Sequence, residues 1–231
     1  MAKKPILLLA DSQNLFWQID NTPFLNIFFN NALPQKAVYI GAANGDRPEY
    51  YEIFRAAMQT CGIPFCTHIH SSFTATDRSH LQEADLILLS GGDTHKGWQI
   101  IKNSGMDKII VRRYAHGAYL IGISAGAIQI GLMGIDEQER TFETLKCIPM
   151  IIDAHQEQEQ WERLKRALKN SGNVYVHGIG IPFGSGIIYH NDHTIESVRR
   201  SAYLFEQTDK GLKQQLILPS RFGRTIKGVL S

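Results

Sequence analysis

The chain has 231 residues, 43% of them hydrophobic and 20% charged, and its 24 Lys and Arg against 22 Asp and Glu leave a net charge of +2. These fractions exclude a disordered or collagen-like chain, and the near-neutral balance argues against a nucleic-acid partner. Apolar runs fall short of the roughly 20 residues that a membrane helix requires, so we expect no membrane partner. We expect a single domain over residues 1–231.

The cysteines and the N-terminus bear on the compartment. Cys61, Cys66 and Cys147 are odd in number, and their spacing fits neither a zinc site nor a disulfide framework. The apolar run near the start ends at Asp11, too short for the roughly 7–15 residues of a signal-peptide core. We therefore expect free thiols and a cytoplasmic protein.

Short apolar runs bounded by Gly, Pro or Asp predict buried strands. In chain order they cover residues 5–10, 36–41, 64–69, 86–92, 118–124 and 147–152. Apolar residues at helical spacing predict helices over 47–60 and 156–170, and a further one over 22–33. Strands alternating with helices indicate an α/β fold, a mostly parallel sheet covered on both faces. The closely spaced runs 174–181, 186–190 and 194–198 predict a C-terminal antiparallel meander.

Open parallel sheets bind ligands beyond the carboxyl ends of their strands. The residues that follow the apolar runs are therefore the candidates for a site. They are Asp11, Asn44, residues 90–94, residues 124–126 and residues 153–155.

The most informative motif is Gly122-Ile-Ser124-Ala-Gly126, which lies between a predicted strand and a predicted helix. That context is typical of a nucleophile elbow, in which a strained turn exposes the serine hydroxyl and the next backbone N–H stabilises an oxyanion. A serine needs a base, and His155 follows the run 147–152 at a predicted strand end. The Gly91-Gly92-Asp93 turn after another strand fits a second oxyanion donor.

These three motifs, in this order, resemble the serine peptidase family of dipeptidase E and cyanophycinase, whose fold is similar to class I glutamine amidotransferases. The residues on which this resemblance rests are Gly91-Gly92-Asp93, Gly122-Ile-Ser124-Ala-Gly-Ala127 and Asp153-Ala-His155. The resemblance implies a three-layer α/β/α sandwich. It also implies a small peptide or isopeptide as substrate, no metal or cofactor, and a homodimer as a family-based expectation.

By the same resemblance Ser124 is the nucleophile, His155 is the base, and Gly92 and Ala125 supply the oxyanion N–H groups. Glu139 best matches the family's spacing for the acid that orients the histidine. Four other carboxylates stay open for that role: Asp136, Glu137, Glu143 and Glu157.

Two alternatives to the hydrolase remain. Pro182-Phe183 replaces an acidic pair that is usual in the family, which leaves open a catalytically weak or inactive member that binds a small metabolite or peptide. Amidotransferase chemistry on glutamine is the weaker alternative, because that class uses a cysteine at the elbow. A basic group for an acidic substrate side chain has four candidates: Arg47, Lys96, Arg112 and Arg113.

Overall fold

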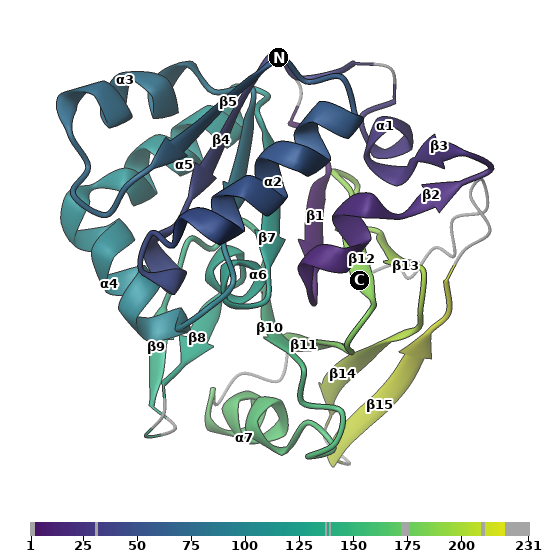
Figure 1. The fold of residues 1–231 in the computed structure, drawn as a ribbon. Helices are drawn as coiled ribbons and strands as arrows, with labels where there is room; N and C mark the ends of the chain where they lie inside the picture. The colour runs from purple at the N-terminus through teal and green to yellow at the C-terminus, as the bar shows by residue number, and fades with distance from the viewer. Residues whose placement is uncertain are drawn as a thin grey trace.

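A seven-stranded sheet forms the centre of the computed structural model, which describes residues 3–30, 32–136, 138, 140–171, 176–208 and 211–219 (Figure 1). Its strand order is β13-β12-β1-β7-β6-β4-β5. The bounds are β1 Ile6–Leu9, β4 Lys36–Ile40, β5 Phe65–Ile69, β6 Leu86–Leu89, β7 Tyr119–Ile123, β12 Gly186–Tyr189 and β13 Ile195–Val198. The first five run parallel, while β12 and β13 are antiparallel to their neighbours, so the predicted mostly parallel sheet is confirmed.

Helices cover both faces of this sheet. One face carries η1 (Ser12–Phe16), α1 (Phe24–Phe28) and α2 (Pro48–Thr60), and the other carries α3 (Ala75–Glu83), α4 (Thr94–Ser104), α5 (Met106–Ala115) and α6 (Ala125–Ile130). Each face of the sheet has its own hydrophobic core. In β1, Leu7 and Leu9 pack into the core under α1 and α2, whereas Ile6 and Leu8 pack into the core under α3 to α6. A strand with two buried faces reads as a continuous apolar run, which explains the sequence pattern.

The observed helices agree with the predicted ranges to different degrees. α2 follows the prediction closely, with Pro48 in its first turn and Phe54, Ala57 and Met58 buried. α7 spans Glu162–Asn170 and begins six residues later than predicted, because a turn occupies the preceding residues. The predicted helix over residues 22–33 is much shorter in the structure: among the described residues of this range, only the five residues of α1 are helical.

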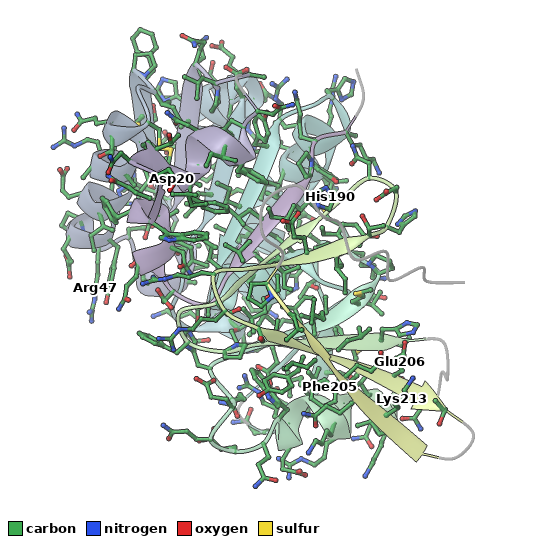
Figure 2. All side chains as sticks on the ribbon, turned by 90° about the vertical axis from the view of Figure 1, so that its right-hand side faces the viewer. Asp20, Arg47, His190, Phe205, Glu206 and Lys213 are labelled. Atoms are coloured by element: carbon green, nitrogen blue, oxygen red, sulfur yellow. The ribbon has the colours of Figure 1, made fainter. Side chains whose placement is uncertain are left out.

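A second sheet of four strands lies beside the first, in the order β10-β11-β14-β15 (Figure 1). Its strands are β10 (Met150–Ala154), β11 (His177–Ile181), β14 (Ala202–Thr208) and β15 (Gly211–Ile217). α7 packs on it around Phe205, and Glu206 pairs with Lys213 across β14 and β15 at 3.6 Å (Figure 2).

The terminal strands therefore do not form one continuous meander. β11 pairs with β10 and β14 in the second sheet, whereas β12 and β13 form an antiparallel hairpin at the edge of the central sheet. The chain crosses between the sheets at residues 182–185. Closely spaced strands in a sequence do not reveal such a crossing, since each strand keeps the same apolar pattern in either sheet.

Small additional elements complete the described chain: η2 (Ala42–Asn44), a β2–β3 hairpin (Gln18–Ile19 and Thr22–Pro23) and a β8–β9 hairpin (Met133–Ile135 and Thr141–Glu143). None of the helices among the described residues is long and apolar enough to cross a bilayer. The cysteines are free thiols, and burial raises the pKa of Cys61 to about 11 and of Cys147 to about 12.

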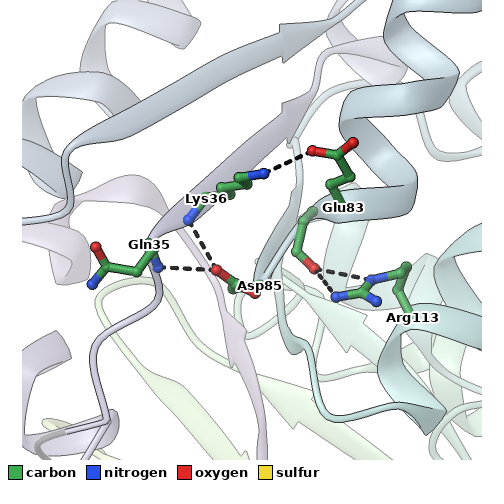
Figure 3. Close-up of polar contacts among 6 residues, drawn as sticks. Gln35, Lys36, Glu83, Asp85 and Arg113 are labelled. Carbon is green, nitrogen blue, oxygen red and sulfur yellow. Dashed lines mark hydrogen bonds and ion pairs between the residues drawn. The ribbon is translucent and has the colours of Figure 1, made fainter.

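Polar contacts tie the amino ends of the central strands together (Figure 3). The Asp85 carboxylate accepts the backbone N–H groups of Gln35 and Lys36, each at 3.1 Å. Arg113 donates to the Ala84 carbonyl at 2.7 Å, and the Lys36 side chain pairs with Glu83 at 2.7 Å. These contacts fix β4, β6 and α5 at the edge of the sheet that lies opposite the candidate site.

Candidate active site

A cavity of about 290 Å³ opens at the carboxyl ends of β1, β6 and β7. Its lining includes most of the strand-end residues that the sequence singles out: Asp11, Asn44, Ser90, Gly91, Gly92, Ser124 and His155. The remaining lining residues are Ala10, Ser12, Leu15, Tyr39, Tyr50, Ile53, Phe54, Ile123 and Phe183. The three motifs thus meet in one cavity, although they lie far apart along the chain.

Ser124 occupies a strained turn between β7 and α6. Its backbone angles, φ 49° and ψ −108°, lie outside the regions that non-glycine residues normally adopt. Its N–H donates to the Leu9 carbonyl at 2.8 Å, which fixes the turn against β1. A methyl group added at Gly122 would lie 2.6 Å from the Gly126 oxygen, and one at Gly126 would lie 2.2 Å from the Leu89 oxygen. The turn therefore has room only for glycine on both sides of the serine.

The glycine turn after β6 lies directly beside this serine. A methyl group added at Gly91 would lie 3.4 Å from the Ser124 Cβ. Gly92 has φ +134°, and a methyl group there would lie 2.2 Å from the carbonyl oxygen of Ala43. That same oxygen accepts the Asp93 N–H at 2.8 Å, so the turn is fixed against the segment that leads into α2. Ala125, as the first residue of α6, has an N–H with no acceptor within its own helix.

His155 reaches the cavity from the second sheet. It follows β10 with φ 60°, and its N–H donates to the Ile181 carbonyl of β11 at 3.2 Å. Its ring lies 5.7 Å from the ring of Phe183, centroid to centroid. The sequence correctly places His155 at the end of a strand, but that strand belongs to a different sheet from the one that carries Ser124.

The crossing segment 182–185 links the two sheets next to the cavity. The Phe183 N–H donates to Glu157 Oε1 at 3.0 Å, and the Gly184 N–H donates to Asp11 Oδ2 at 2.6 Å. The Ala10 N–H donates to the Ser185 carbonyl at 3.1 Å. These bonds hold the loop that follows β10 and the loop that follows β1 in a fixed relation, and so position His155 relative to β7.

Among the described residues, none of the candidate acids hydrogen-bonds to His155. Asp136 pairs with Arg140 at 2.8 Å, and Glu143 pairs with Lys146 at 2.5 Å, which lowers the pKa of Glu143. Glu157 accepts the Phe183 N–H instead. The other two candidates, Glu137 and Glu139, lie outside the described residues.

A buried ion pair supports the strand that carries His155. The Asp153 side chain is 1% exposed, and both its oxygens accept from the Arg163 guanidinium, Oδ2 at 3.3 Å from Nε. Burial raises the pKa of Asp153, and the contacts with Arg163 oppose that rise. The pair joins β10 to α7 two residues before His155.

The wall of the cavity includes residues that the sequence assigns only to a helix or to the core. Tyr50, Ile53 and Phe54 of α2 line it together with Leu15. Tyr39 adds a polar group, and the Asn44 Nδ2 donates to its hydroxyl at 2.5 Å. Burial raises the pKa of Tyr39 to about 12, so this hydroxyl is neutral at ordinary pH. Helical periodicity marks such residues as buried but does not distinguish a cavity wall from a core.

A mostly parallel α/β sheet with a serine at a strand-to-helix elbow, sharing a cavity with a histidine, is the architecture of a serine hydrolase. Comparison with known proteins identifies the family of serine hydrolases to which the chain belongs. The pattern of peptidase family S51 matches residues 6–197, and the chain belongs to this family of serine peptidases.

Individual relatives agree with this assignment. The uncharacterized peptidase YgaJ of Bacillus subtilis (strain 168) is 26% identical over 167 residues, which are 69% of this chain and 71% of YgaJ. Two solved structures share the fold. A peptidase from an acI-B1 Actinobacterium has a TM-score of 0.68 at 14% identity, covering 97% of this chain and 96% of its own. A protein assigned as a peptidase E from Listeria monocytogenes EGD-e has a TM-score of 0.63 at 19% identity, covering 86% and 99%.

Proposed function

We propose that this peptidase hydrolyses a small peptide or isopeptide through an acyl-enzyme on Ser124, with His155 as the base. The observation that carries the proposal is the strained elbow of Ser124 in the cavity that His155 also lines. A backbone conformation of this kind costs about 1–3 kcal/mol and is concentrated at functional sites, where the surrounding structure maintains it. The volume of the cavity, about 290 Å³, is also just below the roughly 300–1,000 Å³ that is usual for ligand sites, which favours a small substrate.

The proposed reaction has two stages. The Ser124 Oγ attacks the substrate carbonyl carbon while His155 takes the hydroxyl proton, and the tetrahedral intermediate then releases the amine, which takes that proton from His155. A water molecule next attacks the ester carbonyl and gives a proton to His155. The ester bond to Ser124 breaks, and the serine oxygen recovers its proton from the histidine.

Backbone donors and a carboxylate complete the proposed site. The N–H groups of Gly92 and Ala125 are the candidates for stabilising the oxyanion, because the glycine turn lies beside Ser124 and Ala125 begins α6. Glu139 is our candidate for the acid that orients His155, on the family's spacing. The ion pairs that engage Asp136 and Glu143 support this choice.

A fluorophosphonate probe tests the nucleophile. Attack by the serine oxygen forms an O–P bond and expels fluoride, so the intact mass rises by one probe adduct. We expect the wild type and Ser79→Ala, a control on the exposed face of α3, to be labelled equally. Ser124→Ala is expected to remain unlabelled. Equal labelling of Ser124→Ala would contradict the proposal, and a wild type without an adduct would favour an inactive, ligand-binding member of the family.

Gly92→Ala tests the oxyanion turn. The added methyl group would collide with the Ala43 carbonyl, so the turn must move and its N–H must lose its alignment. Loss of one oxyanion donor lowers kcat by about 10²–10³-fold, and we expect a loss in that range. Gly62→Ala is the matched control, since Gly62 also has a positive φ (+79°) but has open space around it. It is expected to lose stability without losing activity, and a fully active Gly92→Ala would exclude the turn from catalysis.

A further inference from the structure

The cavity contains little fixed charge. Within the described part of the chain, no lysine or arginine lines it, and Asp11 is its one carboxylate. The Tyr39 hydroxyl and the Asn44 amide, which also line it, are uncharged. A negatively charged substrate group in the cavity would therefore meet the Asp11 carboxylate, with no lysine or arginine beside it among the described lining residues.

The four basic candidates from the sequence lie elsewhere. Arg113 donates to the Ala84 carbonyl at the opposite edge of the sheet, on the same helix as Arg112 (Figure 3). Arg47 is exposed at the start of α2 and points outward at the margin of the molecule (Figure 2). Lys96 lies in the first turn of α4. None of the four is among the described residues that line the cavity.

One side of the cavity is instead apolar and partly open. Tyr50 is 42% exposed although it lines the cavity, and Ile53, Phe54 and Leu15 continue the same wall. This wall adjoins the glycine turn, because Gly92 packs on Ala43 at the segment that leads into α2. His155, which is proposed to protonate the leaving amine, lies beside Phe183 on the crossing segment between the sheets. The apolar wall thus lies next to the proposed oxyanion turn, whereas His155 lies next to Phe183.

We infer that this peptidase selects an uncharged, apolar side chain, aromatic or large aliphatic, on the residue whose carbonyl is attacked, and that it discriminates against an acidic one. The inference rests on the proposed function and specifies its substrate class. Apolar contact with the α2 wall stabilises a side chain such as benzyl or isobutyl. A carboxylate there loses its hydration without gaining a partner, a cost that a neutral side chain does not have.

Matched phosphonate inhibitors test the selectivity. Diphenyl phosphonate analogues of Phe, Leu, Asp and Arg share one reactive group, so their inactivation rate constants differ only through the side chain. We expect the Phe and Leu analogues to react about 100-fold faster than the Asp analogue, since a single apolar group contributes about 10–200-fold in discrimination. An Asp analogue that reacts as fast as the Phe analogue would overturn the inference, as would an Arg analogue that reacts fastest.

Variants of Tyr50 connect the selectivity to the wall. Tyr50→Ala is expected to reduce the preference for the Phe over the Asp analogue by about tenfold, a loss within the range for apolar pocket contacts, whereas Tyr50→Phe retains it. Phe65→Ala is the control, because Phe65 is 65% exposed on β5 and does not line the cavity. An unchanged preference in Tyr50→Ala would contradict the inference that the α2 wall contacts the substrate side chain.

The fluorophosphonate probe, which carries no amino-acid side chain, separates this inference from the proposed function. Labelling of Ser124 without the expected side-chain preference would overturn the inference alone. A wild type that fails to react with the fluorophosphonate and with every phosphonate would overturn both.

Discussion

Replacing Ser124 or His155 by alanine is expected to lower kcat by about 10⁴–10⁶-fold, and the double variant is expected to lose no more than the more damaging single variant. The reason is that the two side chains act as one unit. Without the hydroxyl there is no proton for the histidine to take, and without the histidine the hydroxyl is a weak nucleophile. The release of p-nitrophenol from an apolar amino-acid ester, which is more reactive than an amide, measures the loss.

Two controls make this comparison decisive. Circular dichroism and thermal unfolding should show that all three variants keep the wild-type fold, since Ser124 and His155 line a cavity instead of filling the core. Ser124→Ala is not expected to stabilise the fold by relieving backbone strain, because alanine adopts φ 49° no more readily than serine does. Losses that add in the double variant would show that the two residues act independently.

Replacing Arg163 by methionine is expected to lower the free energy of unfolding by about 3 kcal/mol at pH 8, the lower end of the range for breaking a buried pair. The variant leaves the carboxylate of Asp153, which is 1% exposed, without its partner. The value lies at the lower end because the Arg163 side chain is 33% exposed and already partly hydrated. Urea unfolding monitored by tryptophan fluorescence measures the change.

The pH dependence of that loss has a definite sign. Burial already raises the pKa of Asp153 above its ordinary 3.8, and removing Arg163 takes away the contacts that oppose the rise. A raised folded-state pKa gives stability at low pH that is lost as the pH rises from about 3.8 through the folded-state value. The difference between the variant and the wild type is therefore expected to shrink as the pH falls from 8 to 4.

Lys165→Met is the matched control for Arg163→Met. Lys165 lies on the same helix and pairs with Glu162 at 3.0 Å, but Glu162 is 58% exposed. An ion pair of this kind contributes about 0.2–1 kcal/mol, so only a small change is expected at pH 8. Adding Asp153→Asn to Arg163→Met should recover part of the lost stability, since the uncompensated charge is then gone. Equal losses in the two methionine variants would exclude a special role for the buried pair.

Much of the central sheet and part of the site can be predicted from the sequence, because the signals are local. Both faces of β1, β4, β6 and β7 are buried, so each strand is a continuous apolar run, and Pro48 marks the start of α2. Gly122, Ser124 and Gly126 can be recognised together because steric crowding in the elbow excludes other residues around the serine. The prediction of His155 at a strand end depends equally on a local pattern.

Other features depend on contacts between distant segments. Nothing in the apolar pattern of β10 or β11 indicates a second sheet, since strand pairing is a long-range choice that the pattern does not encode. The prediction of a single C-terminal meander is wrong, because the chain passes from the second sheet to the central sheet at residues 182–185. The hydrogen bonds of this segment to Asp11 and Glu157 join residues up to 173 positions apart.

The residue pattern alone therefore predicts an α/β chain with Ser124, His155 and the Gly92 turn at strand ends, and its motifs resemble the peptidase family. Backbone sterics and apolar periodicity act over a few residues, and a sequence records them directly. The three-dimensional structure is needed to see that His155 comes from a second sheet to share a cavity with Ser124. It is also needed to see that α2 residues form one wall, with no lysine or arginine among the described lining residues. Local patterns do not contain this information, because a cavity forms where separate elements leave space between them, and this space depends on how the whole chain packs.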